Sequence, residues 1–279
     1  MSIPATENER SDSSSSLRAK LAKRWKQGLG RREIWALRVL SVLAILVAWE
    51  LYGRSSNPLL FTYPTAVARA AVDMVADGSL IRALGQSMSV LAAGFVIGTV
   101  IGIALGLLAG RSTVAAALLE LPVNALYATP MVALIPVLVL WFGFGVTSKI
   151  VVVTLFVVFP VLINTMRGVR EVDARLVEVA RTFCSSERRL WFDLILPSAL
   201  PFIVTGIRLA IGRALIGVIV AEFYTAFAGL GYLIVDNANT FKTARVFVPI
   251  VVLMALGVAL TALLEWAEGR VAPWQKATR

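Results

Sequence analysis

Six long apolar segments, separated by short polar stretches, constrain this 279-residue chain more than any other feature of its sequence. A helix needs about 20 apolar residues to cross a hydrocarbon core of roughly 30 Å, and most of the segments reach that length. We therefore predict an all-α integral membrane protein with six transmembrane helices. The segments are 35–52, 86–110, 113–141, 150–166, 202–221 and 246–266.

The third segment is long for one span and contains Pro122, Pro130 and Pro136. Proline removes a backbone donor, and the freed carbonyl must be satisfied inside protein or by water. Either a broken helix or a span followed by a partly re-entrant piece fits this pattern.

The residue inventory excludes several kinds of chemistry. The chain has no histidine and a single cysteine, Cys184, which rules out a serine–histidine triad and a His/Cys zinc site. No Gly-x-x-x-x-Gly-Lys-[Ser/Thr] phosphate loop is present. We predict no catalytic residue, no metal site and no cofactor, so any ATP hydrolysis would belong to a separate polypeptide.

The net charge of +10 would suggest a nucleic-acid partner in a soluble protein, but here the cations collect in a few short loops. Of the 27 Lys and Arg, nineteen fall on one set of alternating sides and six on the other. Because cytoplasmic loops carry the excess of Lys and Arg, we place both termini and the 167–198 loop in the cytoplasm. We therefore predict that the chain lies in a lipid bilayer and binds no nucleic acid.

The same pattern divides the chain into four parts. We predict a disordered basic cytoplasmic tail over 1–33, then a first transmembrane helix with an extracytoplasmic segment over 34–82. The transmembrane core follows over 83–266, and a cytoplasmic tail occupies 267–279.

A glycine recurs at every fourth position of the second segment. Small residues on one helix face let a neighbouring backbone approach closely in lipid. Helix packing is the favoured interpretation, and a sliding or dimerising surface is compatible with it. The residues are Gly94, Gly98, Gly102, Gly106 and Gly110.

Apolar residues recur at helical spacing in the 167–198 loop, at Val172, Leu176, Val179, Ala180 and Phe183. They predict a short amphipathic helix outside the bilayer. An apolar stripe alone does not decide between packing on its own bundle and docking to a partner. A second short helix is predicted to start at 185–187 and to end at 195–197.

The loop resembles the cytoplasmic signature of ABC importer permeases. The similar residues are Glu178, Val179 and Ala180, then Cys184, then Leu194, Ile195, Leu196 and Pro197. With FTYPTAV, TPMVALIPVLVLWFGFG and GIRLAIGRALIGVIVAEFYTAFAGLGYLI, the chain looks like the nitrate/sulfonate/taurine branch of binding-protein-dependent inner-membrane components. The resemblance implies a type I permease core and a homodimer with two ATPase subunits and an extracytoplasmic substrate-binding protein. In that family the loop, here Leu176 to Phe183 and onward to Pro197, couples ATP hydrolysis to transport.

Three positions depart from the family pattern: Val90, Val179 and Cys184. Cys184 replaces a glycine. If that position needs a positive φ, a non-glycine residue costs roughly 1–2 kcal/mol. Either the backbone differs there or the strain is tolerated.

Four residues are candidates for the translocation pathway: Pro130, Pro136, Arg213 and Glu222. The two prolines and Glu222 match family residues, and a structural kink is an alternative role for the prolines. Arg213 lies about 16 Å along its helix from Phe202. It either faces the pathway and favours an anionic substrate or forms an internal hydrogen-bonded pair.

These observations predict a permease subunit of an ATP-driven importer in the cytoplasmic membrane, moving a small anion of the sulfonate, nitrate or taurine kind. A pyrimidine-type vitamin precursor is an alternative substrate. A stand-alone secondary carrier or channel is an alternative function. It would need a coupling site within the spans, where acidic residues are scarce.

Overall fold

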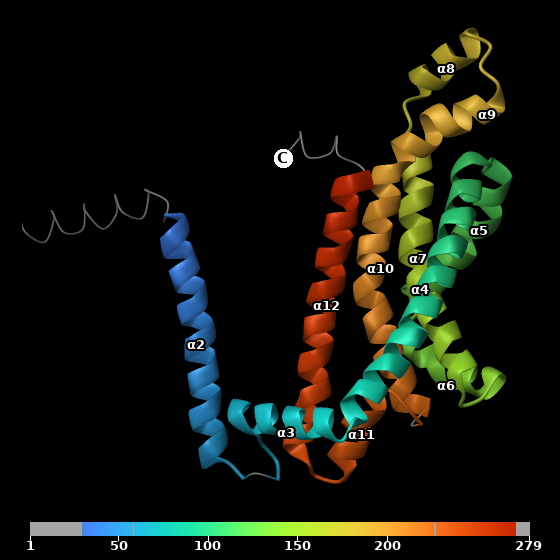
Figure 1. Ribbon diagram of the computed structural model, residues 1–279. Coiled ribbons are helices and arrows are strands. Elements are labelled where there is room, and N and C mark those ends of the chain that lie inside the picture. The colour runs from blue at the N-terminus through green and yellow to red at the C-terminus, as the bar shows by residue number, and fades with distance from the viewer. Residues whose placement is uncertain (1–29, 58, 226, 272–279) are drawn as a thin grey trace, which may run out of the picture. The chain divides into compact units, whose positions relative to one another are not determined.

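The computed structural model describes residues 30–57, 59–225 and 227–271, and all the regular structure within these ranges is helical (Figure 1). The chain divides after Asn57 into two compact units, which are described separately.

The first unit contributes one long helix, α2 (Arg31–Ser55). Glu33 Oε2 accepts a hydrogen bond from the Gly30 N–H at 3.1 Å, which caps the start of the helix. The disordered tail predicted over 1–33 is therefore wrong from Arg31 onward, and the rest of it, 1–29, lies outside the described residues. With 25 residues, α2 is long enough to cross a bilayer.

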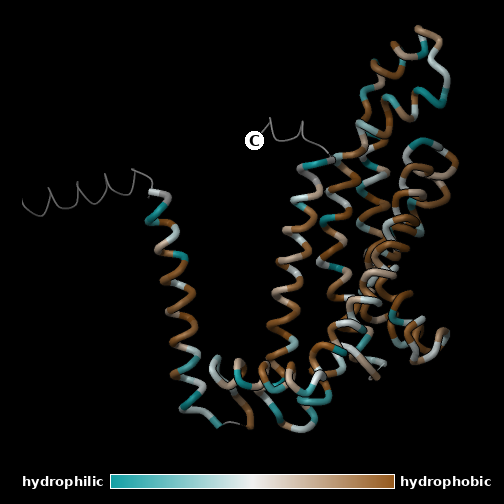
Figure 2. The backbone as a smooth tube through the Cα atoms, viewed as in Figure 1, coloured by the Kyte–Doolittle hydropathy of each residue, from teal (hydrophilic) through white to brown (hydrophobic). Residues whose placement is uncertain are grey.

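Four long helices form the second unit: α4 (Ser79–Arg111), α7 (Val146–Arg170), α10 (Leu196–Thr225) and α12 (Thr243–Val271). With α2, five helices of the described chain are long and apolar enough to span a membrane, and six if one bent pair counts as a span. Figure 2 shows hydrophobic residues along these helices. Within the tail predicted over 267–279, α12 continues to Val271, and the Arg270 guanidinium lies 4.3 Å from the centre of the Trp266 ring. The remainder, 272–279, lies outside the described residues.

The bent pair is the proline-rich third segment. It folds as α5 (Thr113–Ala128) and α6 (Met131–Phe142), with an angle of 102° between them. Only Pro130 lies at the break, because the residue before a proline is pushed out of the helical region, and Thr129 is extended. Pro122 and Pro136 lie inside helices. The segment is therefore interrupted at Pro130, and the bend fits both a broken span and a re-entrant piece.

The core is built on close contact between α4 and α7. A Cβ added at any of the five repeated glycines of α4 would lie 2.5–2.8 Å from the Cβ of a β-branched residue of α7. Real Cβ atoms do not approach so closely, so these positions accept only glycine without a shift. The facing residues also recur every fourth position, and two matched four-residue repeats thus set the register of the helices. They are Val153, Val157, Val161, Thr165 and Val169.

Short helices close the two ends of this unit (Figure 1). At one end, called the α8 end here, lie α8 (Ala174–Thr182), α9 (Glu187–Arg189) and the π-helix η1 (Leu190–Ile195). At the other, the α11 end, lie α3 (Pro64–Ala76) and α11 (Leu230–Asn239). A hydrogen bond of 2.7 Å from Thr243 Oγ1 to the Leu59 carbonyl ties the segment before α3 to α12.

The helix predicted to end at 195–197 instead continues, because α9 runs through η1 into α10. In a π-helix each N–H bonds the carbonyl five residues earlier. The last bond of this kind, from Leu196 N–H to the Trp191 carbonyl, comes directly before Pro197. The hydrogen-bond pattern thus changes from π to α at Pro197, which has no N–H to donate. The proline therefore does not terminate the helix.

Candidate functional site

The loop that begins at Glu171 forms a well-capped helix, α8. Asp173 Oδ1 accepts a hydrogen bond of 2.8 Å from the Arg175 N–H at its start. At its end, Cys184 has φ of +52°, and the Ser185 N–H donates to the Ala180 carbonyl at 3.0 Å. This is the helix end in which glycine is normal. The position therefore keeps the left-handed backbone, and the cysteine tolerates a strain of roughly 1–2 kcal/mol.

Three large apolar side chains of this loop project away from the rest of the unit. Leu176, Val179 and Phe183 are 51%, 52% and 81% exposed, and their spacing of three and four residues places them on one face of α8. We call this set the α8 apolar face. Such a face gains energy only when a partner removes it from water.

Several other apolar residues of the loop pack inward. Ala180, Leu194, Ile195 and Leu196 join a cluster with Val169 and Ile203 at the ends of α7 and α10. Pro197 is exposed at the start of α10. Of the predicted stripe, Val172 and Ala180 pack against the bundle, whereas the three residues of the α8 apolar face are exposed.

Charged groups surround the base of α8. Glu178 lines a small pocket of about 300 Å³ with Arg111 and Arg181. The Glu187 carboxylate lies 3.4 Å from Arg111 Nη2 and 4.0 Å from Arg181 Nη2. These ion pairs are exposed, so each contributes little to stability.

Arg213 pairs with a residue that the sequence reasoning missed. Its Nη2 donates a hydrogen bond of 2.9 Å to the Tyr127 hydroxyl, and its guanidinium lies 4.8 Å from the centre of the Tyr127 ring. Tyr127 is in the last turn of α5, just before the break at Pro130. Pro130 and Pro136 are both exposed. In the sequence, the only indication of this pair is that Tyr127 lies three residues before Pro130 in a mostly apolar segment.

Glu222 is the centre of a buried polar network at the α11 end. Its side chain is 1% exposed. Ser87 Oγ donates to Oε1 at 2.7 Å, and the Gly231 N–H donates to Oε2 at 2.7 Å. The Leu230 N–H in turn donates to Ser87 Oγ at 2.8 Å. The network joins α4, α10 and the start of α11. Its donor–acceptor distances are those of strong hydrogen bonds.

A buried lysine completes this network. Lys149 is 4% exposed, donates to the Ala228 carbonyl at 2.8 Å, and attracts Glu222 electrostatically. The connection between α10 and α11 follows the carboxylate so closely that a Cβ at Gly229, whose φ is +110°, would collide with it. The sequence does not predict the roles of Ser87 and Lys149. Lys149 lies between two apolar segments and enters the sequence argument only as a loop charge.

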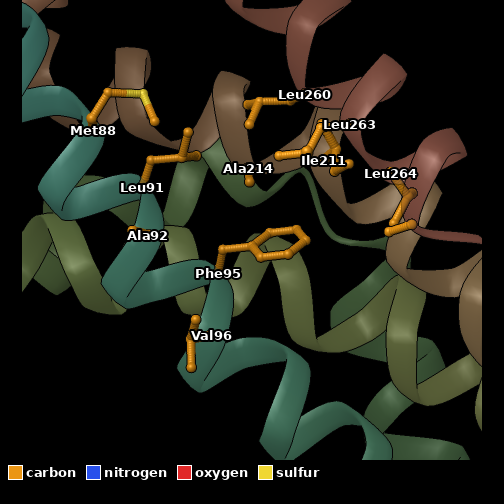
Figure 3. Close-up of a pocket in the computed structure, with 11 residues that line it drawn as sticks. Met88, Leu91, Ala92, Phe95, Val96, Ile211, Ala214, Leu260, Leu263 and Leu264 are labelled. Atoms are coloured by element: carbon orange, nitrogen blue, oxygen red, sulfur yellow. The ribbon is translucent and has the colours of Figure 1, made fainter. Parts of the chain in front are cut away.

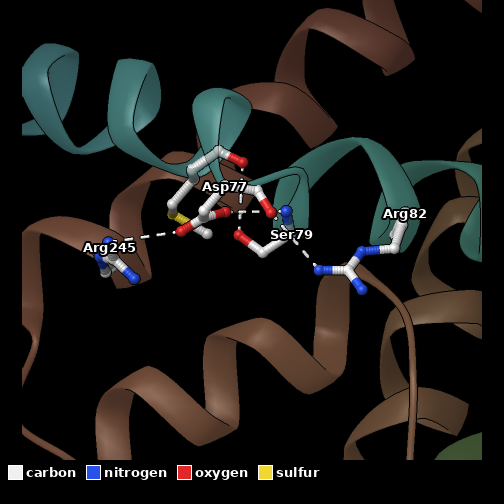
Figure 4. Close-up of polar contacts among 5 residues, drawn as sticks. Asp77, Ser79, Arg82 and Arg245 are labelled. Atoms are coloured by element: carbon white, nitrogen blue, oxygen red, sulfur yellow. Dashed lines mark hydrogen bonds and ion pairs between the residues drawn. The ribbon is translucent and has the colours of Figure 1, made fainter.

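A second polar cluster at the α11 end joins α3, α4 and α12 (Figure 4). Asp77 Oδ1 accepts a hydrogen bond of 2.8 Å from the Ser79 N–H, and Oδ2 lies 3.6 Å from Arg245 Nη2. Ser79, through its side chain and its N–H, holds the pKa of Asp77 below its usual range, with Arg245 and Arg82 adding to the effect.

An apolar pocket of about 370 Å³ lies between α4, α10 and α12 (Figure 3). Met88, Phe95, Ile211 and Leu260 are among its lining residues, all of which are apolar. Because it offers no side-chain hydrogen-bond donor and no charge, this pocket does not suit a small anion.

The chain is similar in sequence to a family of transport proteins. A family model described as "Binding-protein-dependent transport system inner membrane component" matches residues 98–273. The "Putative aliphatic sulfonates transport permease protein SsuC" of Bacillus subtilis is 32% identical over 249 residues, 88% of this chain and 90% of that protein. The formylaminopyrimidine transport permease protein ThiX of Halalkalibacterium halodurans is 32% identical over 239 residues, 85% of this chain and 95% of that protein.

One solved structure supports the fold. It is described as "Crystal structure of an amino acid ABC transporter with histidines" and matches with a TM-score of 0.57 and 19% identity. The match covers 72% of this chain and 98% of that one. At this identity the similarity concerns the arrangement of helices alone.

Proposed function

Because the chain belongs to the family of binding-protein-dependent inner membrane components, the permease subunits of ABC importers, we propose that its α8 apolar face docks on a separate ATPase subunit. The chain is a multi-pass inner membrane protein of this transporter class. It would act as a homodimer with two ATPase subunits and an extracytoplasmic binding protein. The α8 end and both termini would then be cytoplasmic.

The observation that carries this proposal is the exposure of Leu176, Val179 and Phe183 on a helix whose own contacts to the bundle are made by other residues. A soluble loop helix without a partner would gain nothing from such a face. Ala180, Leu194, Ile195, Leu196 and Pro197 would connect this surface to α7 and α10. Glu178, at the polar edge, would add charge complementarity.

The cargo proposed is a small anion of the sulfonate type. Arg213 supports this choice, because it places a guanidinium inside a membrane-spanning helix, where ionisable residues mark substrate pathways. Pro130, Pro136 and Glu222 would shape the pathway around it. The relative named for formylaminopyrimidine transport makes a neutral pyrimidine the alternative cargo.

The test of coupling is copurification in mild detergent with candidate ATPase subunits. Phe183→Ala and Glu178→Arg are expected to lose the ATPase, while Phe192→Ala keeps it. Phe192 is the matched control, since it lies in the same loop and is 62% exposed, but it belongs to η1. Equal retention by Phe183→Ala and wild type would refute docking through the α8 apolar face.

The test of cargo is uptake into proteoliposomes that contain the chain with its ATPase and binding protein. Competition between a short alkanesulfonate and a neutral aminopyrimidine then identifies the substrate class. Uptake of the pyrimidine without uptake of the sulfonate would contradict the anion assignment.

A further inference from the structure

A polar strip runs along α5, which is otherwise almost wholly apolar after Thr113. Its members are Glu120, Asn124 and Tyr127. Their spacing of four and three residues places them on one face of the helix. Leu118, which is 69% exposed, points away from this strip.

Asn124 is the member of the strip that has no polar contact within the described residues. It lies about 16 Å along α5 from Thr113, one turn before the end of the helix at Ala128. Its side chain is exposed and has no hydrogen-bond partner among the residues that the structure describes. An amide facing hydrocarbon without a partner is costly, which favours a position on a water-filled or ligand-filled space.

Two arginines contact the strip, and they differ in how their charge is balanced. Arg170 Nη1 lies 2.5 Å from Glu120 Oε1, so a carboxylate neutralises it. Arg213 is held by the Tyr127 hydroxyl and ring, which carry no net charge. Within the described ranges no carboxylate forms an ion pair with Arg213. The positive charge is therefore fixed in position but left available to an anion.

We propose that Tyr127 is a positioning residue that holds Arg213 for a passing anion and that Asn124, one turn away, contributes N–H donors to the same site. This inference rests on the proposed function and specifies its cargo site. A sulfonate group offers three acceptor oxygens, enough for a guanidinium and an amide together. A neutral pyrimidine would lose the charge-assisted part of this interaction.

The inference predicts that Tyr127 acts only through Arg213, which a double-mutant cycle can test. Transport is measured in proteoliposomes with the whole complex and with alkanesulfonate-loaded binding protein in saturating excess, so that the binding protein contributes equally for every variant. Tyr127→Phe keeps the ring but removes the oxygen that accepts from Arg213. We expect it to lower sulfonate turnover about tenfold, the size typical of a lost hydrogen bond to a charged group.

The decisive comparison is the same change in an Arg213→Gln background, where we expect no further loss. Full additivity of Tyr127→Phe and Arg213→Gln would overturn the positioning role and leave Tyr127 as a packing residue. Unchanged sulfonate turnover in Arg213→Gln would overturn the inference while leaving the sulfonate assignment intact. Failure of the wild-type complex to take up sulfonate would instead refute the proposed cargo.

Asn124→Leu separates a pathway position from a lipid-facing one. We expect it to lower sulfonate turnover several-fold, whereas Leu118→Ala, the control on the opposite face of α5, leaves turnover unchanged. Since leucine is favoured over asparagine in lipid, an Asn124→Leu variant with wild-type turnover would remove Asn124 from the site. A contact between two copies of the chain would show itself as a change in oligomeric state, and that result would equally remove it.

Discussion

The two ends of the second unit handle polar and apolar groups in opposite ways. At the α11 end, Glu222 and Lys149 are withdrawn from solvent and hydrogen-bonded within the chain. At the α8 end, Leu176 and Phe183 extend into solvent with only the edges of the loop packed. A buried polar group must find its partners inside the chain, whereas an exposed apolar group gains energy from a partner outside it. One end is therefore held together by internal hydrogen bonds, and the other presents the face that we propose docks on the ATPase subunit.

The largest expected effect tests the α11 end. Glu222→Leu leaves Ser87, Lys149 and the Gly231 N–H without their acceptor or counter-charge, so we expect a loss of about 3–5 kcal/mol in the free energy of unfolding. The thermal unfolding midpoint in detergent measures it. Glu265→Leu, which replaces an exposed glutamate of α12, should change the free energy by less than about 0.5 kcal/mol. Equal midpoints for the two variants would show that the network does not hold this end together.

The next effect tests the α8 end. Phe183→Ala removes a side chain that touches little of its own chain, so we expect an unchanged unfolding midpoint. Binding of the ATPase subunit should weaken by about 2 kcal/mol, roughly 30-fold, as for a central interface residue. Titration of the ATPase by microscale thermophoresis measures the change. A lowered midpoint with unaltered binding would mean that Phe183 packs internally, and the contrast between the ends would fail.

A smaller effect concerns the strained helix ends. Cys184→Gly removes the energetic cost of the left-handed backbone but raises the conformational entropy of the unfolded chain. We expect a net gain of about 1 kcal/mol in the free energy of unfolding. Phe241, whose φ is +54°, is the equivalent position after α11, and Phe241→Gly should act in the same direction. Ser185→Gly is the control, because Ser185 does not have a positive φ and glycine there should destabilise. A destabilised Cys184→Gly variant would contradict the strain.

The smallest effect is the pH dependence of the Asp77 cluster. The pKa of Asp77 is lowered in the folded protein, so its contribution to stability is present above the unfolded pKa of about 4 and is lost as the pH falls through the lower folded value. The wild type should therefore be more stable than Asp77→Asn at neutral pH, and the difference should disappear in acid. Unfolding midpoints from pH 3 to 7 measure it. Asp73→Asn, at an exposed aspartate one turn earlier, is the matched control for the loss of one carboxylate.

The sequence by itself identified the segments that are long and apolar enough to cross a membrane, because length and freedom from charge are local properties. It also predicted α8, whose periodicity stands out against a polar background, and an interruption of the proline-rich third segment, although not which of its three prolines lies at the break. The glycine repeat of α4 predicted a close contact, although not its partner. The resemblance in the 178–197 loop indicated the family that the comparisons then confirmed.

Only the tertiary structure decided which polar groups meet. Glu222 and Ser87 are 135 residues apart in the chain, and Arg213 and Tyr127 are 86 apart. The spans are apolar on most of their faces, so hydropathy does not define how each helix is rotated about its axis. That rotation comes from the fit of α4 glycines against β-branched residues of α7 and from the bend between α5 and α6. It determines which of the few polar side chains are buried together and which remain exposed.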